Sequence, residues 1–382
     1  MFRKMPIFLL ALIGLIVCLD SFIPLNVKSF FYSLSLSVKS LIIFVLPLII
    51  FMLLFKTLAQ LSSKATKMIL VILAGVCVSN FISTMISYFI GSGIYHTNVS
   101  LVLPQEGAGL APLWVLNWPK LIANDHAMFA GILSGIFLAK FRPLWAEKMS
   151  RYVEKIVSYM LRAITFVLPI FITGFVIKIV HDKTLKTIIG DYSVIFVLIA
   201  LSLFSYIATL YLTVNRFDFS RAISSIKNML PAALTGFSSM SSAAAMPLTI
   251  IATEKNSQNP PLARLAIPAT VNTHLIGDCF AIPIFAFAVM KNFGMAEPTF
   301  YSYLLFACYF VMAKFSVAAI PGGGIIVMLP ILETQFGFTS EMASLITALY
   351  VLFDPVITGA NVIGNGAFAL ILNKLRRRRV TV

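Results

Sequence analysis

The sequence predicts an all-α polytopic membrane protein with eight transmembrane helices and two re-entrant helical hairpins. Hydrophobic residues make up 59% of the 382 residues, charged residues only 11%, and the mean hydropathy is +0.96. This composition excludes a soluble domain of this length. Apolar stretches of about 20 residues, the length of one bilayer crossing, recur along the chain. Two more in the last third are interrupted by small residues, which a lipid-exposed helix cannot tolerate because the freed backbone groups would lack partners.

Six uninterrupted apolar stretches come first, and each is expected to be a transmembrane helix. The earliest resembles a signal peptide, but no small-residue cleavage site follows it and the topology requires it as a helix. The polar interval from Tyr95 to Asn124 is expected to be an external loop, with Trp114 and Trp118 as anchors at the membrane interface. The six stretches lie at about 6–24, 38–58, 67–92, 125–141, 157–180 and 193–214.

The interrupted stretches predict a transport site. The first, at 222–251, contains GFSSMSSAAAMPLTI, and the second, at 301–332, contains KFSVAAIPGGGIIVMLP. Irregular backbone at membrane depth is tolerated where protein buries it or where it lines a cavity, so a pair of interruptions indicates the binding site of a transporter. If both are hairpins that return to their side of entry, the spans at 262–290 and 342–373 complete eight crossings and place both termini on one side.

Positive charge is distributed unevenly over this topology. With both termini in the cytoplasm, 20 of the 29 Lys and Arg residues fall on cytoplasmic segments, seven fall outside, and Arg162 and Lys314 lie within spans. The asymmetry follows the positive-inside rule, so the net charge of +15 reports topology and not a nucleic-acid partner. A bacterial inner membrane is the expected location. The four cysteines lie in apolar stretches without CxxC spacing and are expected to be small buried hydrophobic residues.

Five stretches in order resemble the dicarboxylate/amino acid:cation symporters, a family with the glutamate-transporter fold. GFSSMSSAAAMP is similar to the serine-rich tip of that family's first hairpin, and AIPGGG (319–324) to the glycine-rich tip of its second. ATVNTHLIG (269–277) lies where the family's unwound seventh helix carries an Asn-Met-Asp-Gly-Thr motif. DPVITGANVIGNG (354–366) resembles the eighth-helix substrate and cation motif, and FVLPLIIFMLL (44–54) resembles the second helix.

The resemblance extends from about residue 37 to 375 and implies that the chain is divided into a scaffold region and a transport core. Residues 1–215 would be mainly scaffold and oligomerisation spans, with some helices of the transport unit. Residues 216–382 would form the transport core: hairpin 1, the unwound helix 7, hairpin 2 and helix 8. The family also implies a homotrimer in which the transport unit of each protomer moves across the membrane.

Both hairpin tips are candidates for binding a substrate carboxylate. Ser241 and Ser242 would offer hydroxyl and backbone N–H groups, because a half-helix directs its unpaired N–H groups towards an anion. Alternatively, these serines only allow close helix packing. Resemblance adds Ala319, Pro321 and Gly322 of the second tip to the substrate site. The PGGG sequence there supplies the backbone freedom that a lid needs to open and close.

Asp354, in the middle of the last apolar span, is the most informative single residue, because a carboxylate at membrane depth is costly and functional by default. By resemblance it holds the α-ammonium group of an amino acid, and Thr358 and Asn361, further along the same helix face, contact the rest of the substrate. Members that carry acidic substrates have an arginine where this chain has Ile357. Without that bidentate partner a neutral amino acid is favoured, although the Gly-Asn-Gly sequence at 364–366 is more similar to C4-dicarboxylate carriers.

The positions that resemble the family's cation sites are altered. Sodium needs several oxygen ligands, preferably including a carboxylate, but the family's aspartates are replaced here by His274 and Asn365. Asn272 and backbone carbonyls remain, and Ser83 and Thr84 resemble hydroxyl ligands of a third cation site. We therefore expect fewer coupled sodium ions, or none, and no cofactor apart from a coupling sodium ion or proton.

Two further ionisable residues each have two interpretations. Lys314 lies close to where family members bind another cation; its ammonium either replaces that cation or extends to the membrane surface. His274, with Asp278 one turn later, is a candidate proton relay, because imidazole changes charge near neutral pH. The alternative for His274 is a neutral, hydrogen-bonded packing residue.

These features predict a secondary active, cation-coupled symporter of a small neutral amino acid, working by alternating access with hairpin gating, and not an enzyme. Its expected partners are a small-molecule substrate and the lipid bilayer. A carrier of C4-dicarboxylates or acidic amino acids and a passive channel remain alternatives. An intramembrane hydrolase would need a nucleophile such as Ser238 or Ser239, but the G-x-S-x-G elbow is absent and the paired hairpins would be unexplained.

Overall fold

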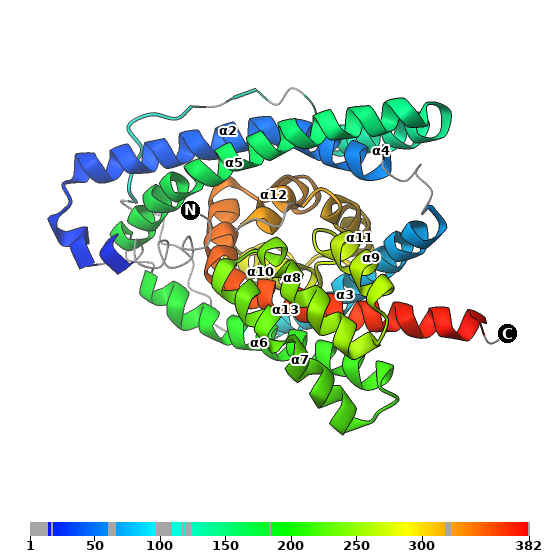
Figure 1. The fold of residues 1–382 in the computed structure, drawn as a ribbon. Helices are drawn as coiled ribbons and strands as arrows, with labels where there is room; N and C mark the ends of the chain where they lie inside the picture. Colours follow the sequence, from blue (N-terminus) through cyan, green and yellow to red (C-terminus); the bar gives the residue numbers. More distant parts are fainter. Residues whose placement is uncertain are drawn as a thin grey trace.

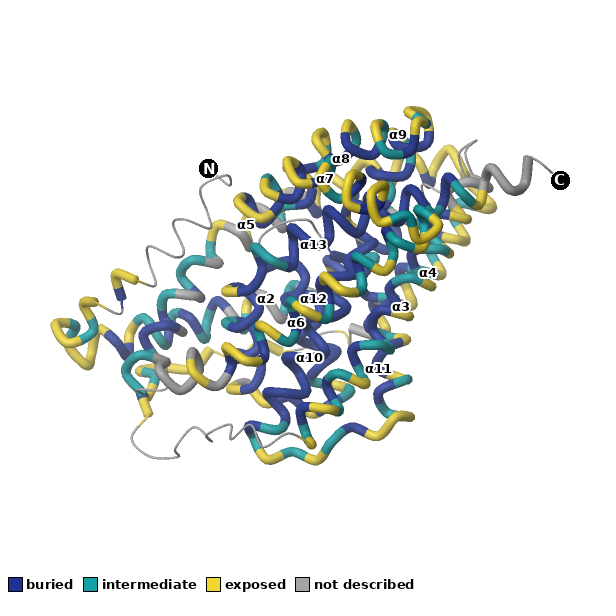
Figure 2. The backbone as a smooth tube through the Cα atoms, turned by 90° about the horizontal axis from the view of Figure 1, so that it is seen from below, coloured by how far each residue is buried: buried dark blue, intermediate teal, exposed yellow. Residues whose placement is uncertain are grey.

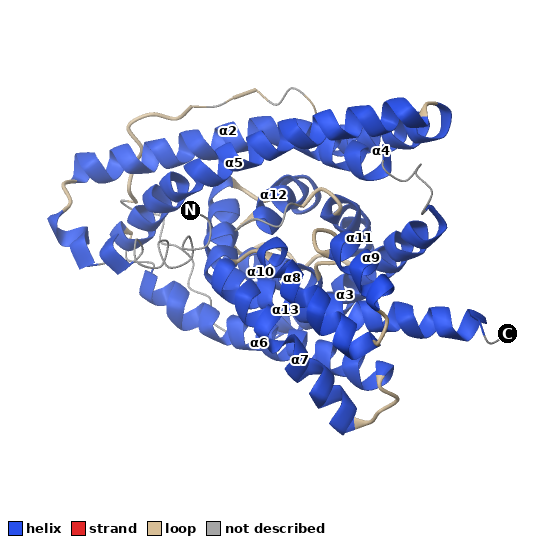
Figure 3. Ribbon diagram, viewed as in Figure 1, coloured by secondary structure: helices blue, strands red, loops and turns tan. Residues whose placement is uncertain are grey.

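The computed structural model describes residues 14–380 apart from 17, 60–65, 97–108, 117, 120–121, 123, 183–184 and 318–321. Every regular element among these residues is a helix (Figure 3), which confirms the all-helical fold class. Residues 6–13 and 17 of the predicted first span, 6–24, lie outside the described residues. The elements are the 3₁₀ helix η2 (Asp20–Phe22) and the α-helices α2 (Leu25–Ala59), α3 (Thr66–His96), α4 (Asn124–Phe141), α5 (Pro143–His181), α6 (Leu185–Val214), α7 (Phe219–Ser239), α8 (Ser242–Ser257), α9 (Pro260–Thr270), α10 (Ile276–Asn292), α11 (Phe300–Lys314), α12 (Gly323–Phe336) and α13 (Ser340–Val380).

Three helices of the described chain are long and apolar enough to cross a membrane. They contain the spans Leu70–His96 in α3, Tyr192–Val214 in α6 and Glu341–Leu375 in α13, with a mean hydropathy between 1.6 and 2.3. Apolar helices such as α11 and α12 are shorter than the ~20 residues that one crossing requires. The chain is therefore a multi-pass membrane protein that also contains apolar half-length helices.

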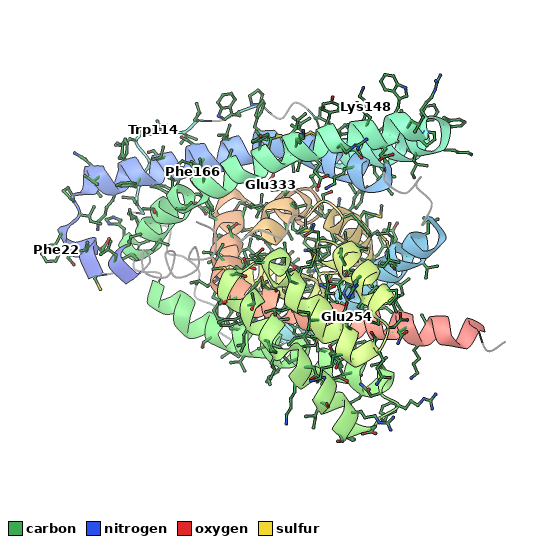
Figure 4. All side chains as sticks on the ribbon, in the orientation of Figure 1. Phe22, Trp114, Lys148, Phe166, Glu254 and Glu333 are labelled. Carbon is green, nitrogen blue, oxygen red and sulfur yellow. The ribbon has the colours of Figure 1, made fainter. Side chains whose placement is uncertain are left out.

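The helices α2, α4 and α5 form an outer layer along one edge of the molecule (Figure 1). Glycines let this layer pack closely: a side chain at Gly131 of α4 or Gly174 of α5 would overlap backbone atoms of α2. Phe166 of α5 and Trp114, in the segment between α3 and α4 that is bonded to Ser33 of α2, are both exposed (Figure 4), as expected of residues that face lipid or the membrane interface. Trp118 is also exposed and packs on Phe44 of α2.

The centre of the molecule is α10, which is buried from Ile276 to Met290 (Figure 2). A helix that is apolar around its whole circumference belongs in a protein core. It packs against α3, α6 and α13. A glycine again allows two helices to pack closely: a side chain at Gly277 of α10 would overlap the carbonyl oxygen of Ile357 on α13.

Five breaks separate the six helices between residues 219 and 336, and three of these breaks bear on the site. The helices α7 and α8 meet at Met240, whose φ of 47° is left-handed, and Ser241, which caps α8. They run antiparallel, since Asn228 Nδ2 donates to Asn256 Oδ1 across the pair. The chain unwinds at 271–275, between α9 and α10; further along, α11 ends at Lys314 and α12 begins at Gly323, on the two sides of residues 318–321.

Candidate substrate and cation site

One face of α13 carries polar side chains at helical spacing. The five residues are buried in an otherwise apolar span, and hydrogen bonds connect the stripe to α10 and to the start of α12. The sequence predicted four of them but missed Tyr350, which lies one turn before Asp354 and was detectable as a hydroxyl on the same helix face. The stripe consists of Tyr350, Asp354, Thr358, Asn361 and Asn365.

Asp354 is a buried carboxylate with only neutral partners in the described structure. The backbone N–H of Gly322 donates to Oδ2 at 2.8 Å, and the hydroxyl of Thr358 donates to Oδ1 at 3.0 Å. Its exposed fraction is 3%. A carboxylate has about four acceptor positions, so Asp354 retains capacity for a cationic group.

Asp278, at the start of α10, has a different set of partners. Tyr350 donates its hydroxyl to Oδ1 at 2.7 Å, Asn361 Nδ2 donates to Oδ2 at 2.9 Å, and Lys314 Nζ lies 3.5 Å from Oδ1. Asn361 also accepts the backbone N–H of Gly277 at 2.7 Å. Asn361 therefore joins α10 to α13 through both ends of its amide group.

Lys314, the last residue of α11, is fully buried, with an exposed fraction of 0%. This excludes the interpretation in which its ammonium extends to the membrane surface. Its Nζ lies 4.4 Å from the centre of the Phe310 ring, a cation–π distance. No hydrogen-bond acceptor in the described part of the chain pairs with Nζ, so its one charged partner there is Asp278.

The unwound segment before α10 is held by Asn80 of α3, which the sequence reasoning missed. Asn80 Nδ2 donates to the carbonyl of Thr273 at 2.7 Å, and its Oδ1 accepts the backbone N–H of Leu275 at 3.3 Å. An unwound turn frees backbone groups that must find partners when buried. The signal was present in the sequence as an amide within the apolar span 67–92.

We expect Asn80→Ala to destabilise the protein by about 2–4 kcal/mol, because two buried backbone groups lose their partner at about 1–3 kcal/mol each. The measurement is thermal unfolding of the purified protein in detergent. Thr209→Ala is the matched control, since that hydroxyl is exposed and bonds only to its own helix at Ser205. An Asn80→Ala protein as stable as the control would show that Asn80 does not hold the unwound segment.

His274 lies in the same unwound segment, and both of its ring nitrogens have neutral partners. Nδ1 is 3.0 Å from Asn365 Oδ1, and Nε2 is 2.8 Å from the hydroxyl of Ser79. Its ring also packs against Phe368 at a centroid distance of 4.5 Å. The described bonds of Asp278 go elsewhere, so the structure gives the two members of the predicted relay separate partners.

The other predicted residues lie in different surroundings. Ser83 and Thr84 are buried, but their hydroxyls donate to carbonyls of their own helix. Asn272 is exposed. Ala319 and Pro321 lie outside the described residues.

The α7–α8 tip lies against the polar stripe. Gly236, one turn before the tip, packs so closely on α13 that an added side chain would meet Val362 and Thr358. Ser241 caps α8 by accepting the N–H of Ala244, and Ser242 is buried. The helices α8 and α12 both pack on α13, and the N-terminus of α10 contacts the stripe through Gly277 and Asn361. Helix N-termini suit an anion.

The site as a whole combines groups that bind charged ligand atoms. In the described part of the chain, no three His, Cys, Asp or Glu side chains are grouped to hold a metal ion. Two carboxylates, one ammonium and the N-termini of α10 and α12 lie together where α10, α12 and α13 meet. This arrangement pairs a cation-binding group with anion-binding groups, which is the chemistry that a zwitterion requires.

Comparisons with known proteins relate the chain to membrane transporters. The chain is 24% identical over 340 residues to "Serine/threonine transporter SstT" of Acinetobacter baumannii strain AYE, covering 83% of each chain, and it matches the proteins of the same name from strains AB307-0294 and ATCC 17978 to the same extent. The model of the sodium:dicarboxylate symporter family matches residues 126–375, more than half of the chain. The chain therefore belongs to the sodium:dicarboxylate symporter family and is a membrane transporter, not an enzyme.

Proposed function

We propose that the protein is a cation-coupled symporter of a small neutral amino acid and that Asp354 binds the α-ammonium group of the substrate. The observation that carries this proposal is the buried Asp354 carboxylate, whose described partners are two neutral donors. An ammonium ion would supply the missing charge. Names of relatives support the substrate class, because the Acinetobacter proteins are called serine/threonine transporters.

The charges of the site favour a zwitterion over a dicarboxylate. Asp278, Asp354 and Lys314 are buried together and sum to one net negative charge. A neutral amino acid leaves that sum unchanged, so one monovalent cation makes the loaded site neutral. A dicarboxylate would raise the excess to three negative charges, which is costly in a medium of low dielectric constant. The replacement of the family's arginine by Ile357, which is buried, points the same way.

The substrate carboxylate would bind at the helix N-termini of the two tips. Gly322, the N-cap of α12, has a left-handed φ of 71°, so the first N–H groups of α12 follow directly on the contact with Asp354. Ser241 and Ser242 would contribute from α8, and Ala319 and Pro321 would line the same tip by resemblance. Thr358 and Asn361 would contact the remainder of the substrate.

The same proposal includes the topology and the transport cycle. Eight crossings, two re-entrant hairpins (α7–α8 and α11–α12) and cytoplasmic termini fit the positions of the apolar helices and the positive charges. The α2–α4–α5 layer would be the scaffold of a homotrimer, and α3 and α6 would move with the transport core, since both pack on α10. The α11–α12 hairpin would open as a lid. Burial of the polar stripe favours a carrier over an open channel.

Uptake into proteoliposomes tests the proposal. A panel of neutral amino acids, acidic amino acids and C4-dicarboxylates would be offered with sodium and proton gradients imposed separately. We expect saturable, concentrative uptake of small neutral amino acids such as serine, driven by one of the two gradients. Preferential uptake of succinate or malate would contradict the substrate class, and uptake without saturation or exchange would indicate a channel.

His274 is proposed to act in packing, because neutral groups bind both of its nitrogens. We expect His274→Gln to keep at least about half of the wild-type accumulation, since glutamine retains donor and acceptor groups. Accumulation and substrate exchange would be compared in the same vesicles. A variant that exchanges substrate but cannot accumulate it along a pH gradient would instead establish the proton relay.

A further inference from the structure

The Lys314–Asp278 pair connects the proposed lid to the core. Lys314 ends α11 at the edge of the interrupted segment, and Asp278 lies in the first turn of α10. Their closest charged atoms are 3.5 Å apart, and both residues are at most 2% exposed. An unpaired charge in such surroundings is strongly unfavourable, so each of these two residues depends on the other.

The surroundings of Asp278 resemble a cation site in which the Lys314 side chain takes the place of the cation. Its oxygens also accept from Tyr350 and Asn361, so neutral donors fix the carboxylate while Lys314 supplies the charge. The aromatic ring of Phe310 holds the ammonium from another side. In the described residues Lys314 Nζ has no hydrogen-bond acceptor that would fix it for another purpose.

We propose that Lys314 is a tethered counter-ion that neutralises Asp278 in place of a mobile cation, so that this transporter moves one cation fewer per substrate than it would with a neutral residue at position 314. The proposal rests on the proposed symport function and adds the number of ions that accompany each substrate. Because a covalently held ammonium cannot be released, the charge it supplies is not transported as cargo.

Replacing Lys314 by a neutral residue should change the number of cations that accompany each substrate. In Lys314→Met the Asp278 carboxylate is left without a charged partner and should recruit a mobile sodium ion or proton to be buried again. We expect the charge moved per substrate to rise by about one elementary charge, because only a neutralised site is buried at low cost. The dependence of uptake on the cation concentration should become steeper.

A charge-conserving double variant is the decisive control. Asp278→Asn/Lys314→Met removes both members of the pair and should restore the wild-type ratio of charge to substrate. The ratio would be measured in proteoliposomes from the membrane potential at which net flux of radiolabelled substrate is zero, with sodium and proton gradients varied separately. If the single variant does not fold, the double variant still tests the proposal. The ratio of charge to substrate and the ion dependence of the double variant can be compared directly with those of the wild type.

Two results would overturn the proposal. One is a functional Lys314→Met transporter with an unchanged ratio. The other is a double variant whose ratio differs from that of the wild type by about one charge, since removing a neutral pair should leave the charge balance intact. Both results compare variants and can be obtained with any substrate that the protein transports. They can therefore be told apart from an error in the substrate assignment.

A second, independent feature is a cavity of about 600 Å³ at the far ends of α6 and α13, lined by Val214, Leu370 and polar side chains. The candidate membrane spans of these helices end at Val214 and Leu375, so the cavity lies at the level of the membrane surface. Two of its amides are held in place by the protein, since Asn256 donates to the Ser225 carbonyl and Asn373 to the Ser257 carbonyl.

The cavity is positively charged. Arg216, Arg221 and Lys374 line it, and the one carboxylate described next to them, Asp218, pairs with Arg221 at 3.0 Å. Phe217 beside it is 67% exposed, as expected of an aromatic residue in contact with lipid. Basic pockets between membrane helices on the cytoplasmic side suit phosphate-bearing head groups.

We infer that this cavity binds a phosphate group, presented by an anionic phospholipid. The test compares thermal unfolding of the wild type and of Arg216→Gln/Arg221→Gln with added phosphatidylglycerol, phosphatidylcholine or inorganic phosphate. Lys148→Gln/Arg151→Gln on the exposed side of α5 removes the same charge elsewhere. We expect phosphatidylglycerol alone to stabilise the wild type and the control more than the cavity variant. Equal stabilisation by inorganic phosphate would assign a soluble ligand of the same chemistry, and equal behaviour of all three proteins would overturn the site.

Discussion

Asp354→Asn is expected to abolish uptake of a neutral amino acid. The substitution keeps the size of the side chain and can keep its contacts with Gly322 and Thr358, but it removes the charge that would pair with the substrate ammonium. Breaking a buried charge pair costs about 3–5 kcal/mol, which corresponds to a loss of at least roughly 100-fold in affinity. The measurement is initial uptake and equilibrium binding of serine in vesicles.

Glu147→Gln is the matched control, because Glu147 is an exposed carboxylate on α5, and this variant should transport like the wild type. Thermal unfolding of both variants separates a loss of binding from a loss of folding. If Asp354→Asn is folded and transports serine with wild-type affinity, the assignment of Asp354 to the substrate ammonium is wrong.

Gly324→Ala is expected to have the second largest effect. Gly324 lies in the first turn of α12, and a methyl group there would overlap Asp278 Oδ1 and the Tyr350 hydroxyl. Neither neighbour can move freely, because they are bonded to each other. Overpacking costs about 1–3 kcal/mol, and here that cost falls on closure of the proposed lid. We expect uptake to fall by about tenfold or more, because a strained closed state is less populated.

The control for this variant is Gly93→Ala in α3, where an added methyl group meets nothing within 4 Å. Alanine favours helix over glycine by up to about 1 kcal/mol, so Gly93→Ala should be as stable as the wild type or more stable. Uptake and unfolding temperature would be measured for both variants. Equal uptake by the two alanine variants would show that α12 can shift away from Asp278 without cost.

The sequence contained enough to predict the class of fold and the family. Apolar length, the interruptions and the order of the motifs are local properties, and the all-helical structure and the family match agree with them. Asp354 was predicted because a carboxylate in an apolar span is costly. Thr358 and Asn361 were predicted because helical spacing puts them on the same face and because they match family positions, and the structure places all three on one buried face.

What the sequence did not predict is which partners each polar group has. Helical spacing suggested that His274 and Asp278 act together, but the chain unwinds at 271–275, so the helical repeat does not carry through this segment. Their described partners come from α3, α11 and α13, distant in the sequence. Asn80 and Tyr350 were missed for the same reason, since tertiary contacts decide whether a polar residue in an apolar span is structural or functional.

Recognition of an ammonium group by Asp354 is the central feature of the proposed site, and competition between two ligands tests it directly. Serine and glycerate share a carboxylate and a terminal hydroxyl and differ in the α-substituent, which is an ammonium in serine and a hydroxyl in glycerate. Inhibition of labelled serine uptake by each would be measured in wild-type vesicles. We predict that glycerate inhibits at least about 100-fold more weakly than unlabelled serine, the factor expected when a buried carboxylate loses its ion partner. Equal inhibition by glycerate, or stronger inhibition by succinate, would contradict the account.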